Sequence, residues 1–146
     1  MLTFVVYGKP EPQGSTKAFI PRGWKRPVIT SDNKKMKPWR QQVAGTAINV
    51  PGMVLWKKKQ GGIAMNLRFV FMRPASLPKF WTIANKKPDA DKLQRAIFDA
   101  LTGITYEDDS MVVSLVVEKV YGTRECVEIG IEYLSHGTTT ERLKAK

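Results

Sequence analysis

The sequence predicts a small α+β domain in which two helices pack on one face of a mixed or antiparallel sheet. Two segments carry most of this prediction. In residues 63–72 the apolar side chains alternate with Asn66 and Arg68, a period of two that is typical of a half-buried strand. In residues 93–101 the apolar side chains recur at the spacing of one helical face. The elements follow in the order strand, loop, helix, strand, loop, helix and two strands.

The other regular elements follow from shorter patterns. Residues 2–7 are predicted to form the first strand. Residues 38–48 are predicted to form the first helix, because the apolar residues fall on one face. The second helix is expected to begin at Asp91. Two strands, residues 111–121 and 125–134, are joined by a link of hairpin length.

Two long segments rich in proline and cations are predicted to be loops. Residues 9–27 form a long loop or an irregular hairpin before a short strand at 28–30. Residues 73–88 form a mobile basic loop. Its Phe80 and Trp81 either hold the loop to the core or stack on unpaired bases.

The length and composition predict one domain. The 146 residues, 42% of them hydrophobic, suffice for a single core, which we assign to residues 1–135, with residues 136–146 as a polar tail. The single cysteine, Cys126, excludes an internal disulfide and a cysteine-rich zinc site. With no signal-peptide pattern and no run of about 20 apolar residues, we expect a soluble, cytoplasmic protein without a membrane partner.

The charge is strongly segregated along the chain. The net charge is +11, and residues 1–88 carry 17 Lys and Arg against only two acids, whereas residues 89–146 carry 7 against 11. A basic surface that neutralises phosphates beside a compact acidic centre is typical of an enzyme acting on nucleic acid. A generally basic, well-solvated surface is the alternative.

Four aspartates form the candidate centre. Asp89 and Asp91 are two residues apart in the extended backbone before a helix, so both side chains point to the same face. Asp108 and Asp109 lie on the turn before the next strand, and a shared site is plausible because helix and turn form one unit. Such oxygen ligands bind Mg²⁺ or Mn²⁺. Alternatively, these residues only cap the helix and form the turn.

Three cations accompany the aspartates. Lys92 and Arg95 lie one helical turn apart, and Lys119 lies on the following strand. They either hold the scissile phosphate or form ordinary ion pairs with Asp99 and Glu118.

The segment PDADKLQRAIFDALTGITYEDDSMVV, within residues 88–120, resembles the signature of the RusA family of Holliday-junction resolvases from bacteria, phages and prophages. The signature is a D-x-D pair, a helix with F-D-A-L and a D-D turn before a strand. The opening VVYGKPEPQGSTKAF is also similar to family members. The resemblance implies a RusA-like fold, a homodimer and Mg²⁺-dependent, paired symmetric nicking of four-way junctions in DNA recombination and repair.

Carried over to this sequence, the resemblance implies that Asp89, Asp91 and Asp109 are essential carboxylates, with Asp108 beside them. Family members often have Asn and an essential Lys at the positions that Lys92 and Arg95 occupy here. Arginine keeps the positive charge but cannot donate a proton near neutral pH. If the family lysine transfers a proton, Lys92 or Lys119 must replace it.

The cations expected to bind the DNA backbone lie mainly in the two predicted loops and before the first helix. They are Lys9, Lys17, Arg22, Lys25, Arg26, Lys34, Lys35, Lys37, Arg40, Arg73, Lys79, Lys86 and Lys87. Two rival functions remain. A non-catalytic module that binds branched DNA or single strands would use the charge and the tryptophans, and an RNA-binding protein would use the charge alone.

Overall fold

The computed structural model describes residues 1–14, 16–31 and 33–138, and within them six strands and two helices follow one another along the chain. They are β1 (Leu2–Tyr7), β2 (Thr16–Phe19), β3 (Val28–Ser31), α1 (Met36–Ala47), β4 (Gly61–Met72), α2 (Ala90–Leu101), the 3₁₀ turn η1 (Asp109–Met111), β5 (Val112–Gly122) and β6 (Cys126–Ser135). The predicted α+β class is confirmed. The last described residues, 136–138, include His136, which is hydrogen-bonded to Gln60 and Lys58, and residues 139–146 of the expected tail lie outside the described part.

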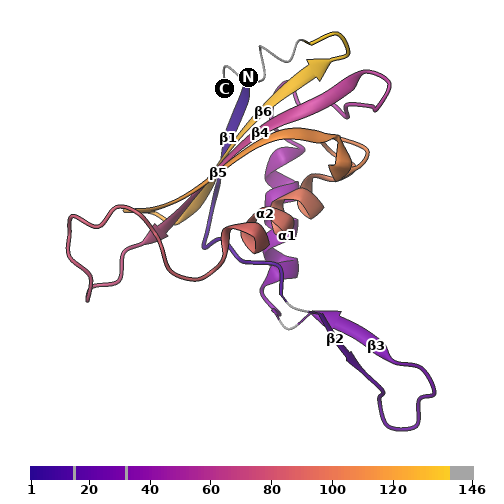
Figure 1. Ribbon diagram of the computed structural model, residues 1–146, viewed down its shortest axis with the longest axis vertical. Coiled ribbons are helices and arrows are strands. Elements are labelled where there is room, and N and C mark those ends of the chain that lie inside the picture. Colours follow the sequence, from indigo (N-terminus) through magenta and orange to yellow (C-terminus); the bar gives the residue numbers. More distant parts are fainter. Residues whose placement is uncertain (15, 32, 139–146) are drawn as a thin grey trace.

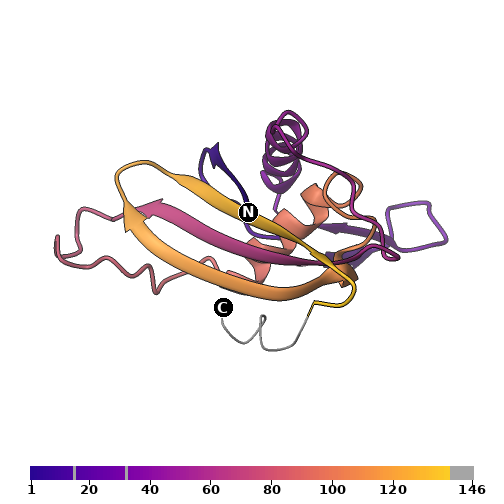
Figure 2. The ribbon, with the colours of Figure 1, turned by 90° about the horizontal axis from the view of Figure 1, so that it is seen from above.

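The main sheet is mixed, with strand order β1-β6-β4-β5 (Figure 1). β4 pairs antiparallel with β6 and parallel with β5. Both helices cover one face of this sheet, and no helix of the described residues lies on the other face (Figure 2). This arrangement confirms the prediction that two helices pack on one side.

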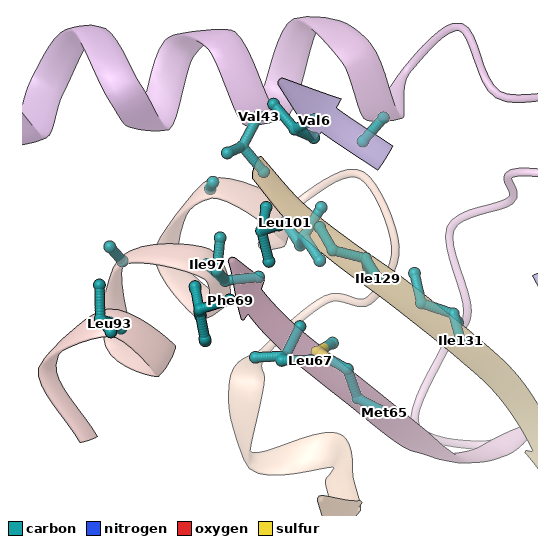
Figure 3. Packing of buried hydrophobic residues seen from close by; sticks show 14 of the residues in the cluster. Val6, Val43, Met65, Leu67, Phe69, Leu93, Ile97, Leu101, Ile129 and Ile131 are labelled. Carbon is teal, nitrogen blue, oxygen red and sulfur yellow. The ribbon is translucent and has the colours of Figure 1, made fainter. Parts of the chain in front are cut away.

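The core lies between the helices and the sheet (Figure 3). The alternation predicted for β4 holds, because Leu67 and Phe69 are buried while Asn66 and Arg68 are exposed. The apolar face of α2 packs over β4, with Ile97 fully buried. The other labelled core residues are Val6, Val43, Met65, Leu93, Leu101, Ile129 and Ile131.

The hairpin expected between the last two strands is wrong. β5 and β6 are joined by residues 123–125, but β4 lies between them in the sheet. The four residue-to-residue steps from Gly122 to Cys126 span about 13 Å when the chain is extended. This is enough to pass over β4, because each neighbouring strand lies about 5 Å from it. β5 pairs with β4 rather than with β6 because the chain crosses over from β4 to β5 through α2. A helix between two strands returns the chain to the same end of the sheet, so the two strands pair in parallel.

Both segments predicted to be loops contain strand pairing. In the first, β2 and β3 form an antiparallel hairpin, which was one of the two expectations for this segment. In the second, Ile83 pairs with Val120, so this loop covers one end of β5. Phe80 is 79% exposed and is not an anchor, whereas Trp81 is partly buried.

The turn after α2 is held by Tyr106. This residue is fully buried, and its hydroxyl donates to the carbonyl oxygen of Phe98 at 2.8 Å. Burial, with a smaller contribution from the charge of Asp109, raises the pKa of Tyr106 well above its ordinary value. The ring therefore stays neutral and fixes the turn to the last part of α2.

Replacing Tyr106 by phenylalanine is expected to lower the free energy of unfolding by about 1 kcal/mol. The cost stays small because the Phe98 carbonyl keeps its hydrogen bonds from Thr102. Thermal denaturation should show a midpoint about 3 °C lower. Tyr7→Phe, at a ring that is 47% exposed, is the control, and equal midpoints for the two variants would contradict this role of the hydroxyl.

Candidate active site

A cavity of about 610 Å³ opens between residues 13–14, α2 and the turn before β5. Its lining provides carboxylate, amide and cationic groups, and the ring of Phe98 adds apolar surface. The lining residues are Gln13, Gly14, Lys92, Gln94, Arg95, Phe98, Asp99 and Asp109. Three of the residues expected from the sequence, Lys92, Arg95 and Asp109, therefore share one cavity.

A second hollow of about 390 Å³ lies beside the first turn of α2. Its lining includes Asp89, Lys9 and Glu11. Lys92 lines both cavities, so it lies between the region of Asp89 and the region of Asp109. The two hollows together follow one side of α2.

The segment before β2 is fixed against α2 by its backbone. The N–H of Gln13 donates to the carbonyl oxygen of Lys92 at 2.9 Å. Asn33 donates to the carbonyl oxygen of Pro12 at 2.8 Å and so ties the same segment to the residues before α1. The side-chain oxygen of Gln13 is buried and has no hydrogen-bond partner among the described residues. Gln13 has no signal in the sequence, since only the fold brings it to the cavity.

Asp89 and Asp91 lie at the start of α2. Asp89 occupies the N-cap position with extended backbone, but its side chain makes no capping hydrogen bond. Asp91 is exposed in the first turn. This geometry therefore does not support the alternative in which Asp89 caps the helix with its side chain. The carboxylates of Asp89 and Asp91 both remain available to a ligand.

Asp108 behaves as a capping residue of the turn. Its carboxylate accepts hydrogen bonds from the hydroxyl of Ser110 at 2.9 Å and from the Ser110 N–H at 3.4 Å. Lys58 lies 3.5 Å from the same carboxylate. The turn function that the sequence left open is thus observed for Asp108.

The described part of one chain does not gather the four aspartates. Asp109 shares its cavity with Asp99, and Asp99 follows Asp91 by eight residues of helix, which is about 12 Å of rise. Among the described residues no group of three or more His, Cys, Asp or Glu is placed to hold a metal ion. The crossover topology explains why the aspartates are not gathered. The helix α2 runs back along the parallel pair β4 and β5, so the first turn of α2 lies away from the start of β5.

The cations near the aspartates have different environments. Arg40 forms the ion pair with Asp99, at 3.4 Å, and Lys119 donates to the carbonyl oxygen of Lys86 at 2.6 Å. Within the described residues Lys92 and Arg95 form no ion pair. The ion-pair alternative therefore gains no support for these two residues, which leaves their charges available to an anion.

Most of the cations expected to bind DNA are exposed. Arg40 and Arg73 are partly buried, and the side chain of Lys17 lies outside the described part of the structure. The exposed ones are Lys9, Arg22, Lys25, Arg26, Lys34, Lys35, Lys37, Lys79, Lys86 and Lys87.

The neighbouring carboxyl groups of Asp108 and Asp109 shift in opposite directions. Hydrogen bonds from Ser110 lower the pKa of Asp108 below its ordinary value. Desolvation, followed by the hydrogen bond and charge of Asp108, raises the pKa of Asp109 above its ordinary value. At neutral pH the charge of Asp108 therefore stabilises the fold, and that of Asp109 destabilises it.

This difference predicts opposite effects of two matched substitutions in the absence of divalent ions. At pH 7, Asp109→Asn should raise the thermal midpoint, because it removes a charge that folding disfavours, and Asp108→Asn should lower it. As the pH falls through the raised pKa of Asp109 in the folded protein, protonation of this carboxyl group makes wild type more stable. At lower pH, near the lowered pKa of Asp108 in the folded protein, wild type loses the stability that the Asp108 charge contributes. Both variant differences should therefore shrink in acid. A lower midpoint for Asp109→Asn at pH 7 would contradict the assignment.

The fold and these residues define a small, strongly basic α+β protein with carboxylates and free cations along one helix. The chain matches the family model Endodeoxyribonuclease RusA over residues 8–132. It is also 30% identical over 145 residues to Uncharacterized protein YqaN of Bacillus subtilis (strain 168), an alignment that covers 92% of this chain and 97% of that protein. The chain belongs to the RusA endodeoxyribonuclease family.

Membership extends the resemblance seen in residues 88–120 to most of the chain. RusA proteins are crossover junction endodeoxyribonucleases, so membership implies a resolvase type of activity on branched DNA, and the family is generally Mg²⁺-dependent. None of the helices in the described ranges has the length and apolar character needed to span a bilayer.

Proposed function

We propose that this protein resolves four-way DNA junctions by paired, symmetric and metal-dependent nicks. The observation that carries the proposal is the family match over residues 8–132, which includes all four aspartates. The cavity supports it, because Asp109 shares it with Lys92 and Arg95, two cations of α2 that form no ion pair among the described residues. We assign essential roles to Asp89, Asp91 and Asp109, with Asp108 supporting the turn.

Mg²⁺ is the proposed cofactor, with Mn²⁺ able to replace it. Carboxylate oxygens are the ligands that these ions prefer, so the donor set fits in kind. The arrangement of these carboxylates in the described part of one chain does not fit a metal site, since no three of them lie together. When bound, such an ion activates water and stabilises the charged transition state.

Lys92 and Arg95 are proposed to hold the scissile phosphate. Both line the cavity of Asp109, and neither is neutralised by an ion pair within the described residues. Arg95 provides charge but no proton near neutral pH. Lys92, which lies between the two hollows, is the better candidate to protonate the leaving oxygen, since the ammonium group of Lys119 is bound to the Lys86 carbonyl.

The exposed cations are proposed to bind the arms of the junction through phosphates, so that the shape of the DNA is recognised rather than its sequence. A four-way junction has approximate two-fold symmetry. Two matched cuts require two matched sites, and a homodimer with two-fold symmetry provides them.

The direct test is the cleavage of a labelled synthetic four-way junction and of a linear duplex of the same sequence, each with Mg²⁺, Mn²⁺ or EDTA. The proposal expects paired nicks in the junction only, and only with a metal ion. Tight binding in every condition without cleavage would instead favour a non-catalytic module.

A further inference from the structure

β2 and β3 form a two-stranded arm, residues 16–31, that stands apart from the main sheet. The strands pair antiparallel from Thr16 with Ser31 to Phe19 with Val28. Among the described residues no strand of the main sheet pairs with them. Figure 1 shows the arm extending away from the sheet and from both helices. Its outer end, residues 20–27, is therefore placed to reach a partner.

A tight turn orders the end of the arm. The N–H of Trp24 donates to the carbonyl oxygen of Pro21 at 2.9 Å. Gly23 has a φ of +85°, the conformation that a type II turn requires at its third residue. The backbone of Trp24 is thus fixed by a hydrogen-bonded turn on a paired stem.

The arm ends in exposed apolar side chains. Trp24 is 61% exposed and Ile20 63% exposed. The other three tryptophans differ, since Trp39 is 4% exposed, the indole N–H of Trp56 is hydrogen-bonded to a backbone carbonyl, and Trp81 is partly buried. Trp24 therefore does not contribute to the hydrophobic core, and its indole ring is exposed to solvent.

The charge of the arm indicates the chemistry of its partner. Residues 16–31 contain Lys17, Arg22, Lys25 and Arg26 and no acidic residue. Cations beside an exposed indole suit a polyanion that offers flat apolar faces, which is nucleic acid with unstacked bases. An anionic lipid surface offers charge and apolar contact as well, but the family of this chain acts on DNA.

We propose that Trp24 stacks on a base at the branch point of the DNA, while Arg22, Lys25 and Arg26 hold the neighbouring phosphates. The strands of a four-way junction exchange partners at the branch point, so base pairs there are interrupted on one side and open most easily. An aromatic wedge inserted at that point opens the junction centre. This inference rests on the proposed binding of branched DNA.

The test uses a set of junctions that each carry 2-aminopurine at one branch-point position, a base whose fluorescence rises when it loses its stacked neighbour, with the full chain in EDTA. Wild type should raise the fluorescence at the positions that the inserted ring unstacks, whereas a 2-aminopurine that stacks on the indole itself stays quenched. Trp24→Ala should abolish the rise and weaken junction binding about tenfold or more, while duplex binding stays the same. Trp24→Phe should retain the rise, and so should Ile20→Ala, which removes apolar area from the same arm without removing an aromatic ring.

Several results would overturn the inference. An unchanged rise with Trp24→Ala would show that the ring does not enter the junction, and equal loss with Ile20→Ala would indicate a general apolar contact. Binding to phosphatidylserine vesicles that depends on Trp24 would assign the arm to lipid, and loss of a dimer in Trp24→Ala would assign it to a second copy. If wild type binds no DNA at all, the proposed function fails as well, which distinguishes that case from the others.

Discussion

Asp91→Asn is expected to lower the rate of junction nicking about a hundredfold or more. The substitution keeps the size of the side chain but removes the charge that a divalent ion requires. Because Asp91 is exposed in the first turn of α2 and makes no contact in the core, the fold should remain intact. The measurement is the single-turnover nicking rate in saturating Mg²⁺, together with junction binding in EDTA, which should not fall.

The matched control is Glu107→Gln, which removes an exposed carboxylate from the turn after α2. Its nicking rate should stay within about twofold of wild type, since a solvated surface charge contributes little. Cleavage by Asp91→Asn at the wild-type rate would remove Asp91 from the site. Loss of junction binding together with cleavage would instead assign Asp91 to DNA positioning or to the fold.

The largest effect on stability is expected for Phe69→Ala. Phe69 is fully buried near the centre of β4, where it is paired with strands on both sides and packs beneath α2. Removing its ring leaves a cavity and should cost about 3–5 kcal/mol of unfolding free energy. Thermal denaturation followed by circular dichroism should show a midpoint about 10 °C lower or more.

Phe80→Ala makes the same chemical change at a side chain that is 79% exposed. Its midpoint should remain within about 2 °C of wild type, because exposed substitutions away from special features change stability little. If both variants lost the same stability, the core would not be centred on β4.

The elements of the main domain were predictable where one periodicity dominates. In β4 and α2 the buried faces match the spacing of the apolar residues, because burial against one neighbouring layer imposes that spacing. The strand order was not predictable in the same way. The short link between β5 and β6 is compatible with a hairpin, and only the pairing of β4 with both strands shows that it passes over a strand.

The candidate site was predictable in its residue types and less so in its geometry. The motif named the aspartates, and their closeness along the chain suggested one cluster, but no three such groups lie together among the described residues. Gln13 could not be found from the sequence, because it reaches the cavity through a backbone hydrogen bond to Lys92. The exposure of Trp24 could not be predicted, since composition carries no information on how far a hairpin extends from the core.

The separation of the arm from the main sheet has a consequence for how such a protein can diversify. Within the described residues no backbone hydrogen bond joins the stem of β2 and β3 to the strands that form the core. Insertions, deletions or substitutions in residues 19–28 therefore carry little penalty for folding, and they leave the residues along α2 where they are. Under the role proposed for the arm, preference among DNA shapes can change in this segment while the residues proposed for cleavage stay the same.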